Sequence, residues 1–274
     1  MTAPTAQSVR LYRRPWRGIA AALFAVSRLA LPFMLWRVIV ASDPPVSPPM
    51  LARALLILSV LPGLAAWLIG RAFAARLRLD TAGATLVRGG SELRLTAGAS
   101  AAARVGWLPW PEPAVALRRA GGWLPFVVAL RDPGPLLAAL DDAAARHPVA
   151  VYAAARGAAP RWGYWVARYA VFPLLPAAVL FRAHQYIAYG GPFGQYYLLG
   201  LEPYLRSAAI HWSTTAAYLL LYASAWRGAA EVVAFATAWV APRAARPVRR
   251  AAELVCSLAF WLGVPIVLAL RFWA

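Results

Sequence analysis

The chain has 274 residues, 62% of them hydrophobic, and a mean hydropathy of +0.58, which exceeds that of an ordinary soluble domain. Its formal net charge of +18 comes from 28 basic residues, all of them arginine, against 10 acidic ones. Because these arginines cluster beside apolar segments, the charge is typical of membrane orientation and not of a nucleic-acid-binding surface, so nucleic acid is not an expected partner.

Five apolar stretches are long enough to cross a membrane. A spanning helix needs about 20 apolar residues to cross ~30 Å of hydrocarbon. The sequence predicts spans at residues 18–41, 51–73, 162–181, 204–226 and 251–272. The pattern leaves two alternatives for residues 228–240, a continuation of the fourth helix or a separate surface helix, and Pro62-Gly63 predicts a kink in the second stretch. The fold class is therefore an α-helical multi-pass membrane protein.

The distribution of arginine predicts the orientation of these spans. Four arginines precede the first span, many lie in the segment between the second and third, and five lie between the fourth and fifth: Arg227, Arg243, Arg246, Arg249 and Arg250. The other side has few. Since cytoplasmic loops carry the excess of arginine, we expect a cytoplasmic N-terminus and an external C-terminus.

Residues 75–147 have a different character, with period-two alternation interrupted by turn residues. The pattern predicts strands at 75–80, 84–88, 92–96, 114–119 and 123–130. Asp132 and Pro133 are then suited to begin a helix. The predicted domains are an N-terminal tail with a helical hairpin (1–74), an inserted antiparallel β domain closed by one helix (75–147), and spans three to five (148–274).

Residues 77–140 resemble the pleckstrin-homology-like (PH-like) cytoplasmic domains of bacterial membrane proteins. The resemblance rests on the order of several strands followed by one helix and on the pieces Leu79-Asp80-Thr81-Ala82-Gly83 and Arg131-Asp132-Pro133. It covers about a quarter of the chain. It implies a docking or lipid-facing module in a bacterial inner-membrane protein and does not imply a catalyst.

A candidate binding site lies in the predicted outer loop, residues 182–203, and the start of the fourth span. Two of the three histidines and five of the eleven tyrosines fall between residues 184 and 211. Aromatic residues concentrate at the membrane–water boundary for reasons unrelated to function. The alternative is a ligand or partner site formed by His184, Gln185, Tyr189, Glu202, Arg206 and His211.

Charged residues within and beside the spans form two further groups. Arg28 and Arg168 lie inside predicted spans, where a charge is costly and is by default a functional hypothesis. Near a helix end arginine also extends to the interface, which applies to Arg168. Arg243, Arg246, Arg249 and Arg250 are expected to contact anionic lipid, at ~1 kcal/mol per charge.

No motif for a particular reaction is present: the chain has no phosphate-binding loop, no HExxH, no CxxC and no GxSxG. We expect no cofactor, no metal and no catalytic residue. The leading hypothesis is a non-enzymatic scaffold or accessory subunit that contacts membrane lipids and other membrane or membrane-associated proteins. Two alternatives remain open: binding or transport of a lipid or small amphiphile between the helices, and an enzyme acting on a lipid-linked substrate.

Overall fold

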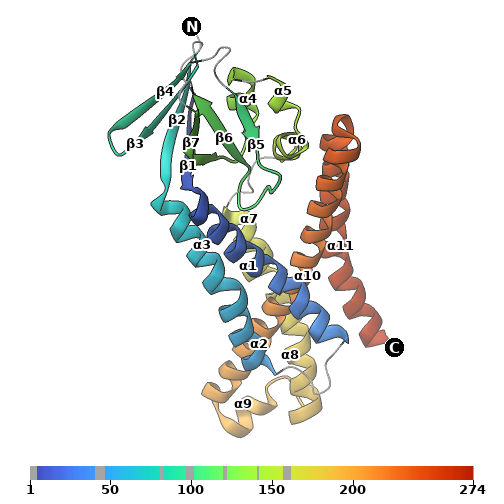
Figure 1. Ribbon diagram of the computed structural model, residues 1–274. Helices are drawn as coiled ribbons and strands as arrows, with labels where there is room; N and C mark the ends of the chain where they lie inside the picture. The colour runs from blue at the N-terminus through green and yellow to red at the C-terminus, as the bar shows by residue number, and fades with distance from the viewer. Residues whose placement is uncertain are drawn as a thin grey trace. The chain divides into compact units, whose positions relative to one another are not determined.

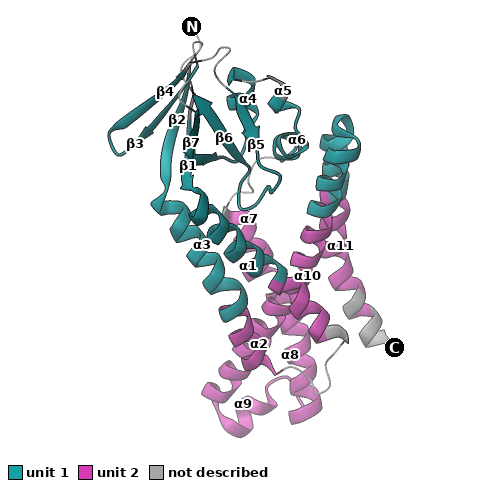
Figure 2. Ribbon diagram, in the orientation of Figure 1, with its two compact units in different colours: residues 1–29, 57–157, 231–252 teal, residues 30–56, 158–230, 253–274 magenta. Residues whose placement is uncertain are grey.

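The computed structural model describes residues 5–40, 47–80, 83–96, 102–119, 122–140, 142–156 and 162–273. Thr81 and Ala82, quoted above for the PH-like resemblance, lie outside these ranges. The chain divides into two compact units (Figure 2). Unit 1 comprises residues 1–29, 57–157 and 231–252, and unit 2 comprises residues 30–56, 158–230 and 253–274.

Within the described part of the chain, four helical segments are long and apolar enough to cross a membrane. These segments indicate a membrane protein, as the composition predicted. They cover Arg14–Val38, Pro48–Ala72, Gly163–Tyr189 and Leu201–Val240 (Figure 1). The fifth predicted span, 251–272, lies within helix α11 (Ala245–Trp273), which follows a short 3-10 turn, η3 (Pro242–Ala244).

Two of the four spans contain a π-helical turn directly before proline. The second span consists of α2 (Pro48–Leu55), η1 (Leu56–Val60) and α3 (Leu61–Ala72), and Pro62 follows η1. In the third span, α7 (Trp162–Val166), η2 (Ala167–Val171) and α8 (Leu174–Tyr189) are arranged in the same way around Pro173. Proline removes a backbone donor and its ring displaces the preceding turn, so the helix widens there.

The fourth span is one continuous helix, α10 (Leu201–Val240), which extends 40 residues. It includes the residues after 226, which the sequence pattern left open. Together with α11 and the first span, α1 (Arg14–Val40), it contributes to both units. Within unit 2, Leu219 and Ala223 of α10 pack with Phe260 of α11, and Leu221 packs with Leu31 and Met34 of α1.

The β domain is a single seven-stranded antiparallel sheet with the strand order β4-β3-β2-β1-β7-β6-β5 (Figure 1). The bounds of its strands are β1 Thr5–Arg13, β2 Ala74–Asp80, β3 Gly83–Arg88, β4 Ser91–Thr96, β5 Ala103–Val105, β6 Ala114–Arg119 and β7 Gly122–Ala129. Gly89 and Gly90 both have positive φ, +54° and +84°, and form the two-residue turn between β3 and β4.

Strand β1 corrects the prediction that the N-terminal segment is a tail outside the β domain. It lies at the centre of the sheet and pairs with β2 on one side, with Val9 opposite Ala75, and with β7 on the other, with Leu11 opposite Val128. The two spans α1 and α2–α3 therefore interrupt the sheet between its first and second strands. Strand pairing across the 60 residues that separate β1 from β2 is not visible in a local sequence pattern.

One face of the sheet forms the hydrophobic core of the β domain. Val9, Leu77, Leu86, Val115 and Val128 are almost fully buried on this face. Three helices follow β7: α4 (Gly134–Leu140), α5 (Asp142–Ala145) and α6 (Pro148–Ala154), and residues of α4 and α6 complete the core. As predicted, Asp132 stabilises the start of the first helix, where its Oδ1 accepts a 3.0 Å hydrogen bond from Gly134 N. The single closing helix of the prediction is in fact three short ones.

On the opposite face of the sheet, the described helices cover β1, β6 and β7. There Tyr12, Ala114 and Ala129 are buried beneath Ala20 of α1 and Phe73, which follows α3. Leu11 N donates a 2.8 Å hydrogen bond to Phe73 O, and the rings of Tyr12 and Phe73 lie 5.6 Å apart. β1 ends at Arg13 and α1 begins at Arg14, so strand and span join without a linker. The sheet and the adjoining parts of the two spans, residues 14–29 and 57–72, thus belong to one folded unit, unit 1.

Candidate functional site

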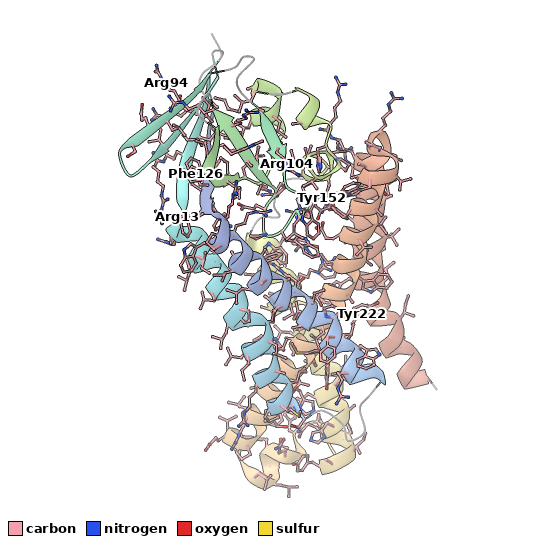
Figure 3. All side chains as sticks on the ribbon, viewed as in Figure 1. Arg13, Arg94, Arg104, Phe126, Tyr152 and Tyr222 are labelled. Atoms are coloured by element: carbon pink, nitrogen blue, oxygen red, sulfur yellow. The ribbon has the colours of Figure 1, made fainter. Side chains whose placement is uncertain are left out.

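The uncovered half of this second face is basic. The strand register places Arg76 opposite Val87 and Val87 opposite Glu92. In the neighbouring row, Arg78, Thr85 and Arg94 lie side by side. The three arginines and Glu92 are exposed, and Figure 3 shows Arg94 projecting from β4. We call Arg76, Arg78, Glu92 and Arg94 the open face; its net charge is positive.

The open face ends at β4, which is an edge strand of the sheet. Its side chains alternate: Leu93 and Leu95 belong to the core, whereas Glu92 and Arg94 are exposed. The other edge strand, β5, has only three residues. An edge strand leaves backbone N–H and C=O groups unpaired, so β4 offers a longer row of such groups to an added strand.

A charged cluster joins the end of the β domain to the last two helices within unit 1. Glu231 of α10 accepts a 2.7 Å hydrogen bond from Arg249 of α11 and another from the hydroxyl of Tyr152 in α6. Arg156 lies 4.0 Å from the same carboxylate. Figure 3 labels Tyr152, which is 1% exposed, and burial raises the pKa of its phenol. We call Tyr152, Arg156, Glu231 and Arg249 the Glu231 cluster.

The Glu231 cluster changes the prediction that four arginines between the fourth and fifth spans contact anionic lipid. Arg243, Arg246 and Arg250 are exposed, as a lipid-contacting group requires. Arg249, in contrast, is only 5% exposed and is paired with Glu231, so it is not free to contact a headgroup. Sequence reasoning missed Glu231 because it lies near the end of a long apolar helix, far in sequence from its partners. The signal was the carboxylate itself, because Glu231 is the sole acidic residue between residues 203 and 240.

The predicted outer loop is mostly helical. It includes the end of α8, all of α9 (Gly194–Leu199) and the beginning of α10. This arrangement brings His184 and His211 together, with their ring centres 5.0 Å apart. Tyr189 also contacts His184, at 6.0 Å. His211 Nδ1 lies 2.9 Å from Ser207 O, so the hydrogen on that nitrogen is donated to the carbonyl.

Gln185 has a structural role in this segment. It is fully buried, and its Nε2 donates a 2.8 Å hydrogen bond to Oε1 of Gln195 in α9. In return Gln195 N donates to Gln185 Oε1 at 3.2 Å, and Gln195 Nε2 donates to Pro203 O at 3.4 Å. The amide pair therefore holds α8, α9 and the first turn of α10 together, and Gln185 offers no surface to a ligand.

The remaining predicted residues of this site stay apart. Glu202 and Arg206 are exposed on the first turns of α10. The histidine pair is thus not accompanied by a carboxylate among the contacts of the described residues. Within the same residues, no group of three or more histidine, cysteine, aspartate or glutamate side chains is placed to hold a metal ion.

The two arginines predicted inside spans have different surroundings. Arg28 is exposed on α1, and its guanidinium carbon lies 5.2 Å from the ring centre of Phe24. Arg168 lies on the π-helical turn η2 and is half-buried among aromatic rings, the nearest being Phe260 at 4.1 Å. Both side chains use ring faces as partners, which stabilises a cation where water is scarce.

No model of a known protein family, no curated protein and no solved structure matches this chain significantly. Its function is therefore argued from its own residues.

Proposed function

We propose that this chain is a non-enzymatic scaffold or accessory subunit of the bacterial inner membrane. Its five spans anchor a cytoplasmic PH-like domain that docks a protein partner. Orientation is argued from the arginine bias, which favours a cytoplasmic N-terminus and sheet. The PH-like assignment is supported by seven antiparallel strands followed by helices that cover one face.

The observation that carries this proposal is the edge strand β4, which has a neighbour on one side only among the described strands and carries part of the open face. A two-residue turn makes Arg88 and Ser91 the closing hydrogen-bonded pair of the β3–β4 hairpin. Bonded pairs alternate along an antiparallel ladder, so the backbone groups of Glu92 and Arg94 face away from β3. An extended segment of the partner would pair there as an eighth strand. Arg78 and Arg94 favour an acidic segment.

The connection between sheet and hairpin supports a scaffold. β1 and β2 are neighbours in the sheet. The chain runs from β1 directly into α1, and it returns to the sheet from α3 into β2. Within unit 1, Ser27 Oγ donates to Ser59 O at 2.7 Å and Ser59 Oγ donates to Ser27 O at 3.0 Å, which ties the two spans together. Within unit 1, a partner bound at β4 would thereby be held in a fixed geometry relative to residues 14–29 of α1 and to α3.

The test is site-specific photo-crosslinking in cells, with the reactive residue introduced at Glu92 of the full chain. We expect one defined crosslinked protein. Arg94→Pro should abolish it, because proline removes an outward-facing N–H without breaking a bond to β3. Arg94→Ala is the matched control: it keeps that N–H and should retain the product. An absence of any product, or equal loss in both variants, would contradict strand addition at β4.

The pairing of His184 with His211 favours a second candidate, the binding of a lipid or small amphiphile at the outer aromatic segment. Two imidazoles within 5.0 Å, flanked by Tyr189, form a polar group among otherwise aromatic neighbours. His184→Ala should then abolish retention of a small molecule while leaving membrane levels intact. A scaffold should tolerate this change and be sensitive to Arg94→Pro instead. The two variants therefore distinguish the two candidate functions.

A further inference from the structure

Arg168 lies in an aromatic setting within the third candidate span, Gly163–Tyr189, in unit 2. Its guanidinium carbon is 4.1 Å from the ring centre of Phe260 and 5.7 Å from that of Tyr169. Nη1 donates a 2.8 Å hydrogen bond to the hydroxyl of Tyr164, whose ring is 5.9 Å from the guanidinium. The cation is thus fixed in position by three aromatic side chains.

The positive charge of Arg168 is not neutralised by a carboxylate among the described residues: its contacts are the three rings and the Tyr164 hydroxyl. Its Nε is buried without a hydrogen-bond partner. An arginine at membrane depth is costly and marks functional positions. The π-helical turn that carries Arg168, η2, is of a kind often found at such positions.

A second arginine borders the same group of rings. Trp165 stacks on Tyr169, with ring centres 5.5 Å apart and planes inclined by 14°. The guanidinium carbon of Arg227, an exposed residue of α10, lies 5.3 Å from the Trp165 ring. Two cations with planar hydrogen-bonding forks therefore border one aromatic stack. Such forks match phosphate geometry and bind it bidentately.

We propose that Arg168 and Arg227 bind the phosphate of one anionic phospholipid. The phosphate source is a lipid because Arg168 lies within a span and exposed apolar side chains follow it on the same segment. Val171, Leu174 and Leu175 are 55%, 51% and 68% exposed and offer a surface to acyl chains. Aromatic residues such as Tyr164 and Trp165 are suited to the headgroup level. This site is separate from the β4 edge and does not depend on it.

The experiment is native mass spectrometry of the full chain in mild detergent, titrated with phosphatidylglycerol and, separately, with phosphatidylcholine. We expect one preferred phosphatidylglycerol. Arg168→Gln should weaken its binding about tenfold or more, because a hydrogen bond to a charged group contributes roughly 1.5–3 kcal/mol. The matched control is Arg182→Gln: Arg182 is exposed on α8 and lies 5.7 Å from the ring of Tyr186, but outside this site.

A second variant and a soluble competitor test the same site. Arg227→Gln changes an exposed residue, so it leaves the fold intact and should still weaken binding by roughly threefold or more. Equal affinity for both lipids, or equal losses in Arg227→Gln and Arg182→Gln, would overturn the proposal. Millimolar glycerol 3-phosphate serves as the soluble competitor. Displacement of the lipid by this anion would assign the site to a free phosphate compound, whereas retention of the lipid supports the proposal.

Discussion

The Glu231 cluster and the surroundings of Arg168 use the same residue types in opposite ways. In each, an arginine lies over a tyrosine ring: Arg249 is 5.4 Å from Tyr152, and Arg168 is 5.7 Å from Tyr169. In the first, Glu231 accepts hydrogen bonds from Arg249 and Tyr152. In the second, the nearest polar partner is the neutral hydroxyl of Tyr164. In the first arrangement a carboxylate contacts the arginines and offsets part of their charge, whereas in the second no described carboxylate contacts the arginine.

The two arrangements differ in how far their polar residues remain available for binding. A buried charge is tolerated when its partners satisfy it, and such a group then serves folding. The Glu231 cluster has this character and fixes α6 to α10 and α11 within unit 1. A cation that is supported only by rings and one hydroxyl retains affinity for an anion. The proposed lipid site follows from this contrast.

We expect the largest effect from a change in the Glu231 cluster. Glu231→Gln removes the carboxylate that accepts the hydrogen bond of Arg249, which is 5% exposed. Breaking a buried ion pair from one side costs about 3–5 kcal/mol, so the free energy of unfolding should fall by that amount. Denaturant unfolding of the full chain in micelles measures it. Glu202→Gln, an exposed position on the same helix, is the control and should change stability by less than about 0.5 kcal/mol. Similar effects of the two variants would show that the Glu231 cluster is not a stabilising contact.

The second prediction extends the comparison to the outer segment. Gln185→Leu keeps most of the side-chain volume but leaves the buried amide of Gln195 without its partner. An unsatisfied buried amide costs about 1–3 kcal/mol, so thermal unfolding should occur at a lower temperature. Tyr186→Leu, at a neighbouring position that is 49% exposed, should have little effect. If Gln185→Leu altered ligand retention and left stability unchanged, Gln185 would be a binding residue after all.

The smallest effect is pH-dependent and concerns α6, which carries Tyr152. His147 Nδ1 accepts a 3.3 Å hydrogen bond from Val149 N and caps this helix. Burial lowers the pKa of His147 below its ordinary value of 6.5. Between the ordinary and the lowered pKa the unfolded chain binds more protons, so the stability due to this group falls as the pH decreases through that window.

His147→Asn keeps a capping acceptor and removes the titration. As the pH is lowered from 7.5 to 5.5, the wild type should therefore lose stability relative to the variant. Lipid binding at Arg168 should stay unchanged in this variant. A pH-independent difference would contradict the role of His147 as a cap that requires its neutral form.

Local patterns predicted much of the fold. The alternation in residues 75–96 and 114–130 was sufficient for five strands, because strand periodicity and glycine turns are properties of neighbouring residues. The positions of η1 and η2 follow from prolines visible in the sequence. Of the candidate site residues, His184, Tyr189 and His211 do lie together, because the end of α8 and the first part of α10 lie close to each other.

Composition and local periodicity predicted a multi-pass helical protein with a β domain inserted among its spans, and four of the described helical segments are long and apolar enough to cross a membrane. Those features depend on composition and on contacts between near neighbours. Only the tertiary structure decided that β1 completes the sheet and that Arg249 is buried against Glu231. It also decided that Gln185 is hydrogen-bonded to Gln195 and that Phe260 lies against Arg168. Most of these contacts join residues from different helices or strands, and what selects them is the packing of whole elements, which no local periodicity encodes.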